Sequence, residues 1–176
     1  MTNRLSTLMH HVITLCRPDE LGTTKLAKML WFADVEHYRR TGQTITGMDD
    51  YRKEEQGPLH RQFYQALDAL KAEGAIAISW NPTPVGPRRE FFSQSLPDLS
   101  CFTAEEIATV DRVVCRIKPM SAKQISIETH DALWNETPWS AKIAVSAGAV
   151  FEGEIEPDLA SWAEAELDRD AHSATA

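Results

Sequence analysis

Apolar residues recur every three or four positions over much of the chain, which predicts amphipathic helices. The first helix is expected over about residues 2–16, and a second over residues 24–41. Gly42 follows the second helix and can take the left-handed conformation that ends a helix. Residues 45–53 are expected to form a short extended segment with a turn at Gly47.

The next stretch predicts another helix and then a hairpin. Gly57 and Pro58 indicate the start of a third helix, because proline is favoured at the first helical position, and Gly74 indicates its end. Residues 75–80 and 88–93 alternate in the manner of strands and are joined by a proline-rich loop. We therefore expect one small β-hairpin.

The last third of the chain predicts helices again. Capping boxes at Thr103–Glu106 and Ser121–Gln124 indicate a fourth and a fifth helix, and an acidic helix is expected over 157–168. The predicted fold class is mainly α (α+β), close to all-α. We expect a compact helical domain at 1–150 with a small β-hairpin, then an acidic C-terminal helix and tail at 151–176.

Asp34 breaks the pattern of the second helix. At 100° per residue its carboxylate falls in the middle of the apolar arc, where an unpaired charge would be costly. Candidate partners are backbone N–H groups of residues 45–53 or of the turn before Pro58, the Tyr51 hydroxyl, Lys53 and His130. We interpret Asp34 as a structural brace, with a catalytic base and a direct contact to a partner as the alternatives.

Phe32 is the reverse case, because it lies on the polar face of the same helix. Either another element of the chain covers Phe32, or it is an apolar anchor in a binding patch with a basic rim. Tyr64 lies off the apolar arc of the third helix and can hydrogen-bond within the fold or anchor a partner. The candidate partner-binding residues are therefore Lys28, Phe32, Arg39 and Tyr64.

The net charge of −8 is concentrated near the C-terminus. Residues 151–170 hold eight acidic side chains and one basic side chain, whereas residues 1–150 are almost neutral. Such a segment repels a phosphate backbone and would attract a basic protein surface, although a solvated, solubilising helix would have the same composition. We expect no nucleic-acid partner.

Other sequence signals bear on compartment and chemistry. The three cysteines are widely spaced and are expected to be buried thiols in a reducing compartment. No apolar run reaches membrane-spanning length, and the N-terminus lacks a cleavage site, so we expect a cytoplasmic protein without membrane contact. The sequence has no nucleophile elbow, phosphate-binding loop, dinucleotide fingerprint or zinc helix. We expect no enzyme activity, no cofactor, no metal and no small-molecule ligand.

Several short motifs follow one another in a recognisable order. They are KLAKMLWFAD at 25–34, GQTITG at 42–47, YRK at 51–53, GP at 57–58, THD at 129–131 and PW at 138–139. Together they resemble the SocA-like antitoxin, or Panacea, domain of bacterial and phage proteins, over roughly residues 20–145. Met29 stands where that family more often has leucine.

The resemblance implies a mainly helical fold without catalytic activity. It also implies the antitoxin of a type II toxin–antitoxin module, which neutralises a cognate protein toxin, the product of the adjacent gene, by direct binding. We expect a structural role for six residues of these motifs, namely Asp34, Tyr51, Gly57, Pro58, His130 and Trp139.

Two alternatives remain open at this point. Three helices followed by a hairpin match the order of a winged-helix DNA-binding regulator, with residues 58–73 as the recognition helix and Arg88 and Arg89 on the wing. Against it, the two basic residues of that helix are offset by two acidic ones. The His130–Asp131 dipeptide could indicate a metal-dependent phosphohydrolase, but no further ligands lie at suitable spacing.

Overall fold

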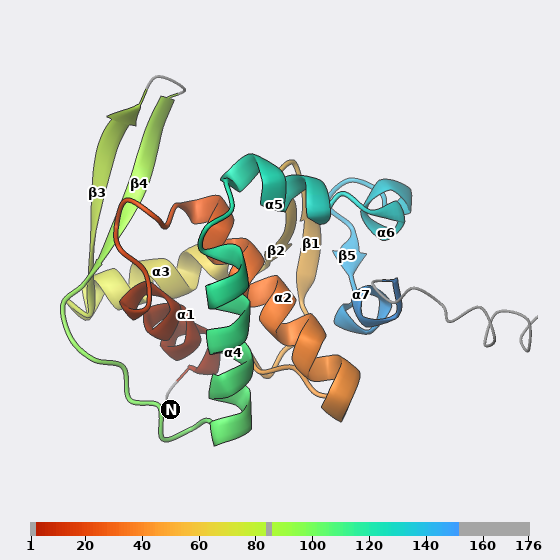
Figure 1. Ribbon diagram of the computed structural model, residues 1–176, viewed down its shortest axis with the longest axis horizontal. Coiled ribbons are helices and arrows are strands. Elements are labelled where there is room, and N and C mark those ends of the chain that lie inside the picture. The colour runs from red at the N-terminus through yellow and green to blue at the C-terminus, as the bar shows by residue number, and fades with distance from the viewer. Residues whose placement is uncertain (1–2, 84–85, 152–176) are drawn as a thin grey trace, which may run out of the picture.

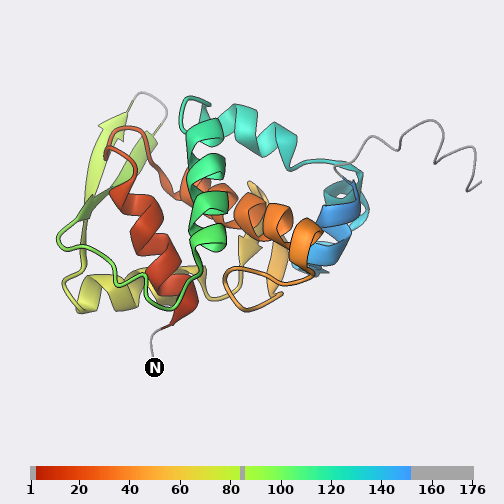
Figure 2. The same ribbon diagram turned by 60° about the horizontal axis from the view of Figure 1, so that its bottom comes forward.

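The computed structural model describes residues 3–83 and 86–151, and helix α2 (Thr23–Thr41) lies at its centre (Figures 1 and 2). Its neighbours surround it on several sides: α1 (Arg4–Thr14), α4 (Ala104–Ile117), α5 (Ala122–Glu128), α7 (Val145–Phe151) and strand β2 (Gly57–His60). This position explains why α2 is apolar over most of its circumference. Gly42 ends the helix in the left-handed conformation, with φ of 70°, as predicted.

A three-stranded antiparallel sheet packs beside α2. Its order is β2, β1 (Tyr51–Glu54) and β5 (Lys142–Ile143), and Tyr51 pairs with both His60 and Ile143. Because β2 is an edge strand, it tolerates a proline that cannot donate a ladder hydrogen bond.

The predicted helix start at Gly57–Pro58 is therefore wrong. Glu54 pairs with Gly57, and Lys53 with Pro58, so a tight hairpin occupies this stretch. Gly57 has φ of 97°, which turns the chain back along β1. Helix α3 (Phe63–Ala72) begins only after β2, and its buried side chains Phe63, Ala66, Leu67 and Leu70 belong to the predicted apolar face.

The predicted hairpin is present and longer than expected. Strands β3 (Ile76–Thr83) and β4 (Gly86–Ser93) pair antiparallel, and their far ends stand away from the helices (Figure 1). Ile76 and Phe91 are buried at its base, whereas most residues toward the tip are exposed. The hairpin is thus anchored in the core at its base, and Arg88 and Arg89 of β4 add contacts to the start of α2 and to α3.

The later helices follow the predicted caps. Thr103 and Glu106 form a capping box at the start of α4, and Ser121 and Gln124 form one at the start of α5. A short helix, α6 (Ala132–Glu136), then leads to β5 and α7, neither of which was predicted.

The expected fold class needs correction. Of the described residues, 50% are helical and 18% lie in strands, which makes the fold α+β with two small sheets rather than mainly or all α. The sheet that includes β5 was missed because its pairing joins residues far apart in the sequence. The predicted acidic helix at 157–168 lies outside the described residues.

The cysteines also differ from expectation. All three are free thiols, but Cys16 and Cys101 are only half-buried and Cys115 is exposed. None of the helices in the described part of the chain has both the length and the apolarity to cross a membrane.

Candidate functional site

Asp34 is fully buried on α2 and binds three hydrogen-bond donors. Its carboxylate accepts from the backbone N–H of Thr46 at 2.9 Å, the Thr46 hydroxyl at 2.6 Å and the Tyr51 hydroxyl at 2.8 Å. Burial raises the pKa of Asp34 to about 6, and these hydrogen bonds oppose the rise. The carboxylate therefore ties the loop after α2 and strand β1 to the central helix.

Two of the predicted partners of Asp34 lie elsewhere. Lys53 donates to the carbonyl oxygens of Asn135 and Thr137, and its ammonium lies 4.1 Å from the ring centroid of Trp134. His130 stacks on the same Trp134 ring at 3.9 Å. These contacts fix the chain around α6 to β1.

Lys28 forms a second buried connection between α2 and the sheet. Its ammonium, with the residue 1% exposed, donates to the carbonyl oxygen of Pro58 at 2.9 Å. Burial lowers the pKa of Lys28 to about 7. A Cβ atom on Gly57 would come within 2.3 Å of the Thr129 hydroxyl and 2.7 Å of the Lys28 ammonium, so only glycine fits there.

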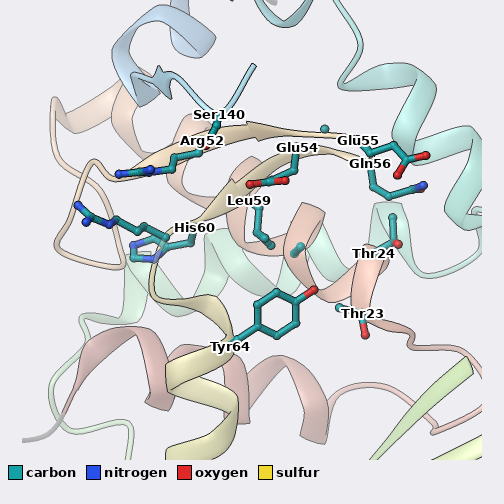
Figure 3. Close-up of a pocket in the computed structure, with 13 residues that line it drawn as sticks. Thr23, Thr24, Arg52, Glu54, Glu55, Gln56, Leu59, His60, Tyr64 and Ser140 are labelled. Carbon is teal, nitrogen blue, oxygen red and sulfur yellow. The ribbon is translucent and has the colours of Figure 1, made fainter. Parts of the chain in front are cut away.

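A cleft of about 470 Å³ lies outside this buried network, between β1, β2, α3 and the start of α2 (Figure 3). The Tyr64 hydroxyl points toward Thr23 across it, and Leu59 forms part of its apolar lining. Arg52 and His60 lie toward one end, and Glu55 lies toward the other. Charges of both signs thus line the cleft.

A larger cleft of about 920 Å³ adjoins the first and shares Thr23, Thr24 and Tyr64 with it. Its walls are the hairpin β3–β4 on one side and the connection between α4 and α5 on the other. The first turn of α2 lines both clefts, and no side chain caps it.

Two exposed aromatic rings hold an arginine at the larger cleft. The guanidinium of Arg89 lies 4.9 Å from the ring centroid of Trp80 and 5.6 Å from that of Tyr64. Trp80 is 59% exposed and Tyr64 50% exposed. We call Tyr64, Trp80 and Arg89 the stacked triad. Aromatic residues and arginine are the types most enriched at the energetic centres of protein interfaces.

The four predicted binding residues lie in different environments. Lys28 and Phe32 are buried, and the Arg116 guanidinium from α4 covers the Phe32 ring at 4.7 Å, so neither offers its side chain to a partner in this structure. Arg39 is exposed and donates to the Ala149 carbonyl. Arg39 lies about 22 Å from Thr24 along the axis of α2. Tyr64 lines both clefts.

Trp80 was not among the predicted binding residues, and Arg89 was considered only as a wing residue of the DNA-binding alternative. The signal that could have found them is the alternation along β3, where Trp80 shares a face with Ile76 and Ile78 yet lies near the tip of the hairpin. The predicted structural residue Trp139 is 63% exposed, unlike Asp34, Tyr51, Gly57 and Pro58. Within residues 3–83 and 86–151, no cluster of three or more His, Cys, Asp or Glu side chains is arranged to hold a metal ion.

Comparison with known proteins gives one result. The family described as "Antitoxin SocA-like, Panacea domain" matches the chain over residues 26–135, which is more than half its length. This match confirms the resemblance predicted from the motifs. No curated protein and no solved structure matches the chain significantly.

Proposed function

Because the chain belongs to the SocA-like antitoxin family with a Panacea domain, we propose that it is the antitoxin of a type II toxin–antitoxin module. It neutralises a protein toxin, encoded by the adjacent gene, through direct contact and without catalysis. The family match over residues 26–135 is the observation that carries this proposal.

The motif residues are mostly buried, which supports different roles for the interior and the surface of the domain. Asp34, Tyr51, Gly57 and Lys28 are buried and hold α2 against the loop and the sheet. The adjoining clefts around Tyr64 lie on the outside and carry exposed rings beside charged groups. We assign the interior to folding and this outer region to the toxin.

The other predicted contact residues differ in how accessible they are to a toxin. Arg39 is exposed and remains a candidate at the far end of α2, whereas Lys28 and Phe32 would contact a toxin only if the domain opened. The acidic segment 151–170 would attract a basic toxin surface. Raising the salt concentration should then weaken the complex, and an affinity that is the same at low and high salt would remove this segment from the interface.

The winged-helix alternative has less support than the antitoxin proposal. It required a recognition helix over residues 58–73, but Gly57–His60 is a strand and the helix covers only Phe63–Ala72. A mobility-shift assay with the DNA upstream of the gene tests it, and binding at physiological salt would revive it.

Co-expression tests the proposed function directly. The open reading frame adjacent to the gene is induced in a bacterial host with and without this chain, and growth and complex formation are measured. We expect the neighbour to stop growth alone, and growth to return together with a complex that can be purified. Growth arrest that persists when this chain is present and folded would refute the proposal.

A further inference from the structure

One face of the hairpin β3–β4 is part of the core at its base and continues along the strands beyond the helices. Ile78 pairs with Phe91, and two positions further along each strand Trp80 pairs with Arg89. Since alternate residues of a strand share a face, Trp80 and Arg89 lie on the same side as the buried Phe91. This face therefore passes from the core to the wall of the larger cleft, where Tyr64 of α3 meets it.

Among the described residues that line the larger cleft, two cations have no carboxylate within ion-pairing distance, Lys25 and Arg89. Lys25 is buried and donates to the Lys118 carbonyl at 2.6 Å, so Arg89 is the more accessible of the two. The other charged side chains of this region form ion pairs within the chain. The pairs are Arg17–Asp19, Lys118–Glu20 at 3.1 Å and Arg88–Glu90 at 2.6 Å. A guanidinium stacked on aromatic faces keeps its N–H groups at the edge of its plane, where they can donate to a carboxylate in a bidentate manner.

Apolar groups stand across the cleft from the stacked triad. Pro119 and Met120 come from the connection between α4 and α5, and Ala122 is the first residue of α5. The volume of about 920 Å³ is in the range of clefts that bind small molecules, which is room for a few side chains of a partner. The cleft thus combines a cation without a carboxylate partner in the described structure with an apolar wall.

We propose that this cleft binds an acidic segment of the toxin, in which a carboxylate pairs with Arg89 and a neighbouring apolar side chain packs between Trp80 and Met120. This inference rests on the proposed antitoxin function and names the chemistry of its partner at that surface. A nucleic-acid phosphate would also suit a guanidinium, but residues 1–150 are almost neutral and give no basic surface of the kind that a polyanion needs. The toxin segment must supply both the acid and the apolar group.

The test compares two charge reversals in the full chain. Arg89→Glu reverses the charge in the cleft, and Arg112→Glu makes the same change at an exposed residue of α4 that lines neither cleft. Affinity for the purified product of the adjacent gene is measured for both, together with the midpoint of thermal unfolding. We expect Arg89→Glu to weaken binding by about 30-fold or more and Arg112→Glu by about twofold or less.

Two further variants connect the loss to the proposed chemistry. Arg89→Lys keeps the charge but loses the planar donor group, so its affinity should lie between those of wild type and Arg89→Glu. Toxin variants selected to bind Arg89→Glu should replace an acidic residue by lysine or arginine. This rescue would not arise if Arg89 acted only on folding.

The outcomes separate the inference from the function on which it rests. If the wild-type chain neither binds nor neutralises the neighbour, the proposed function fails. If the wild type binds and folded Arg89→Glu binds equally well, only the acidic-segment inference is overturned. Tighter binding by Arg89→Glu would mean that the toxin presents a basic group, and not an acidic one, to the cleft. Binding of single-stranded DNA that is lost in Arg89→Glu would assign the site to nucleic acid, and either of these results also overturns the inference.

Discussion

The hydroxyl of Tyr51 donates a 2.8 Å hydrogen bond to the carboxylate of Asp34, and both residues are fully buried. Burial and the neighbouring carboxylate raise the pKa of Tyr51 well above its ordinary value, so its proton stays in place as the donor. The Tyr51 ring also meets Trp31 at 4.9 Å and His60 at 5.1 Å, both edge to face. One pair of side chains thus connects α2 to the middle strand of the sheet.

Removing the Asp34 carboxylate should destabilise the domain. In Asp34→Ala, two hydroxyls and one backbone N–H lose their acceptor, and we expect a loss of about 3 kcal/mol in the free energy of unfolding. Asp34→Asn should cost less, because the amide keeps one acceptor oxygen and both hydroxyls can rotate. Urea denaturation measures both variants, with Asp68→Ala on the exposed side of α3 as the control. A variant that kept its stability but lost the toxin would instead assign Asp34 to binding.

Lys28 should make stability depend on pH in the alkaline range. Its pKa falls from 10.5 in the unfolded chain to about 7 in the folded one, so over this interval the unfolded chain binds more protons. The free energy of unfolding should therefore rise with pH, by at most about 1.4 kcal/mol per pH unit. Asp34 adds no slope there, because its raised pKa of about 6 makes stability fall only between about pH 4 and pH 6.

Urea denaturation at pH 7 and pH 9 tests the contribution of Lys28. We expect the slope to become smaller in Lys28→Met and to stay unchanged in Lys71→Met, where the lysine is exposed on α3. The slope that is left in Lys28→Met is expected from Lys25, whose pKa is also lowered by burial. An unchanged slope in Lys28→Met would show that another group causes the pH dependence.

Gly57→Ala should prevent stable folding. Its φ of 97° disfavours any side chain, and the new Cβ would collide with the Thr129 hydroxyl and the Lys28 ammonium. We expect a loss of about 4 kcal/mol or more, measured by thermal unfolding. Gly42→Ala is the matched control, because its φ is also positive but the space around it is open, and about 1 kcal/mol should be lost. Equal effects of the two substitutions would contradict the steric argument.

The three thiols should react with iodoacetamide at different rates. Cys115 is exposed on α4 and should be alkylated first. Cys16 should be slower than Cys115, because burial raises the pKa of its thiol and less thiolate forms near neutral pH. Mass spectrometry of peptides over time measures the order, and the difference should vanish in urea. Faster alkylation of Cys16 in the native protein would contradict the structure.

Sequence patterns located the central helix and its buried carboxylate because both depend on local spacing. The inward position of Asp34 follows from 100° steps, and two of its partners, the Thr46 N–H and the Tyr51 hydroxyl, were among those proposed. The strand at Gly57–Pro58 could not be found in this way. Its local signal is that of a helix start, and only pairing with β1 and contact with Lys28 and Thr129 make it extended.

The candidate surface was predictable only in part. Tyr64 was noticed because it lies off the apolar arc of its own helix. Arg89 was predicted only as a wing residue of the DNA-binding alternative. Its contact with Tyr64 depends on how the hairpin packs against α3, and the spacing of residues within one element does not reveal that. Phe32 shows the same limit, since the Arg116 guanidinium that covers it comes from a distant helix.

The residues by which this domain is recognised mostly face inward, and this has a consequence for how it could change. Substitutions at Tyr64, Trp80 and Arg89 would leave the contacts of Asp34 and Lys28 untouched. Specificity for a new toxin could therefore evolve, or be engineered, by substitutions at the surface alone while the buried contacts are retained.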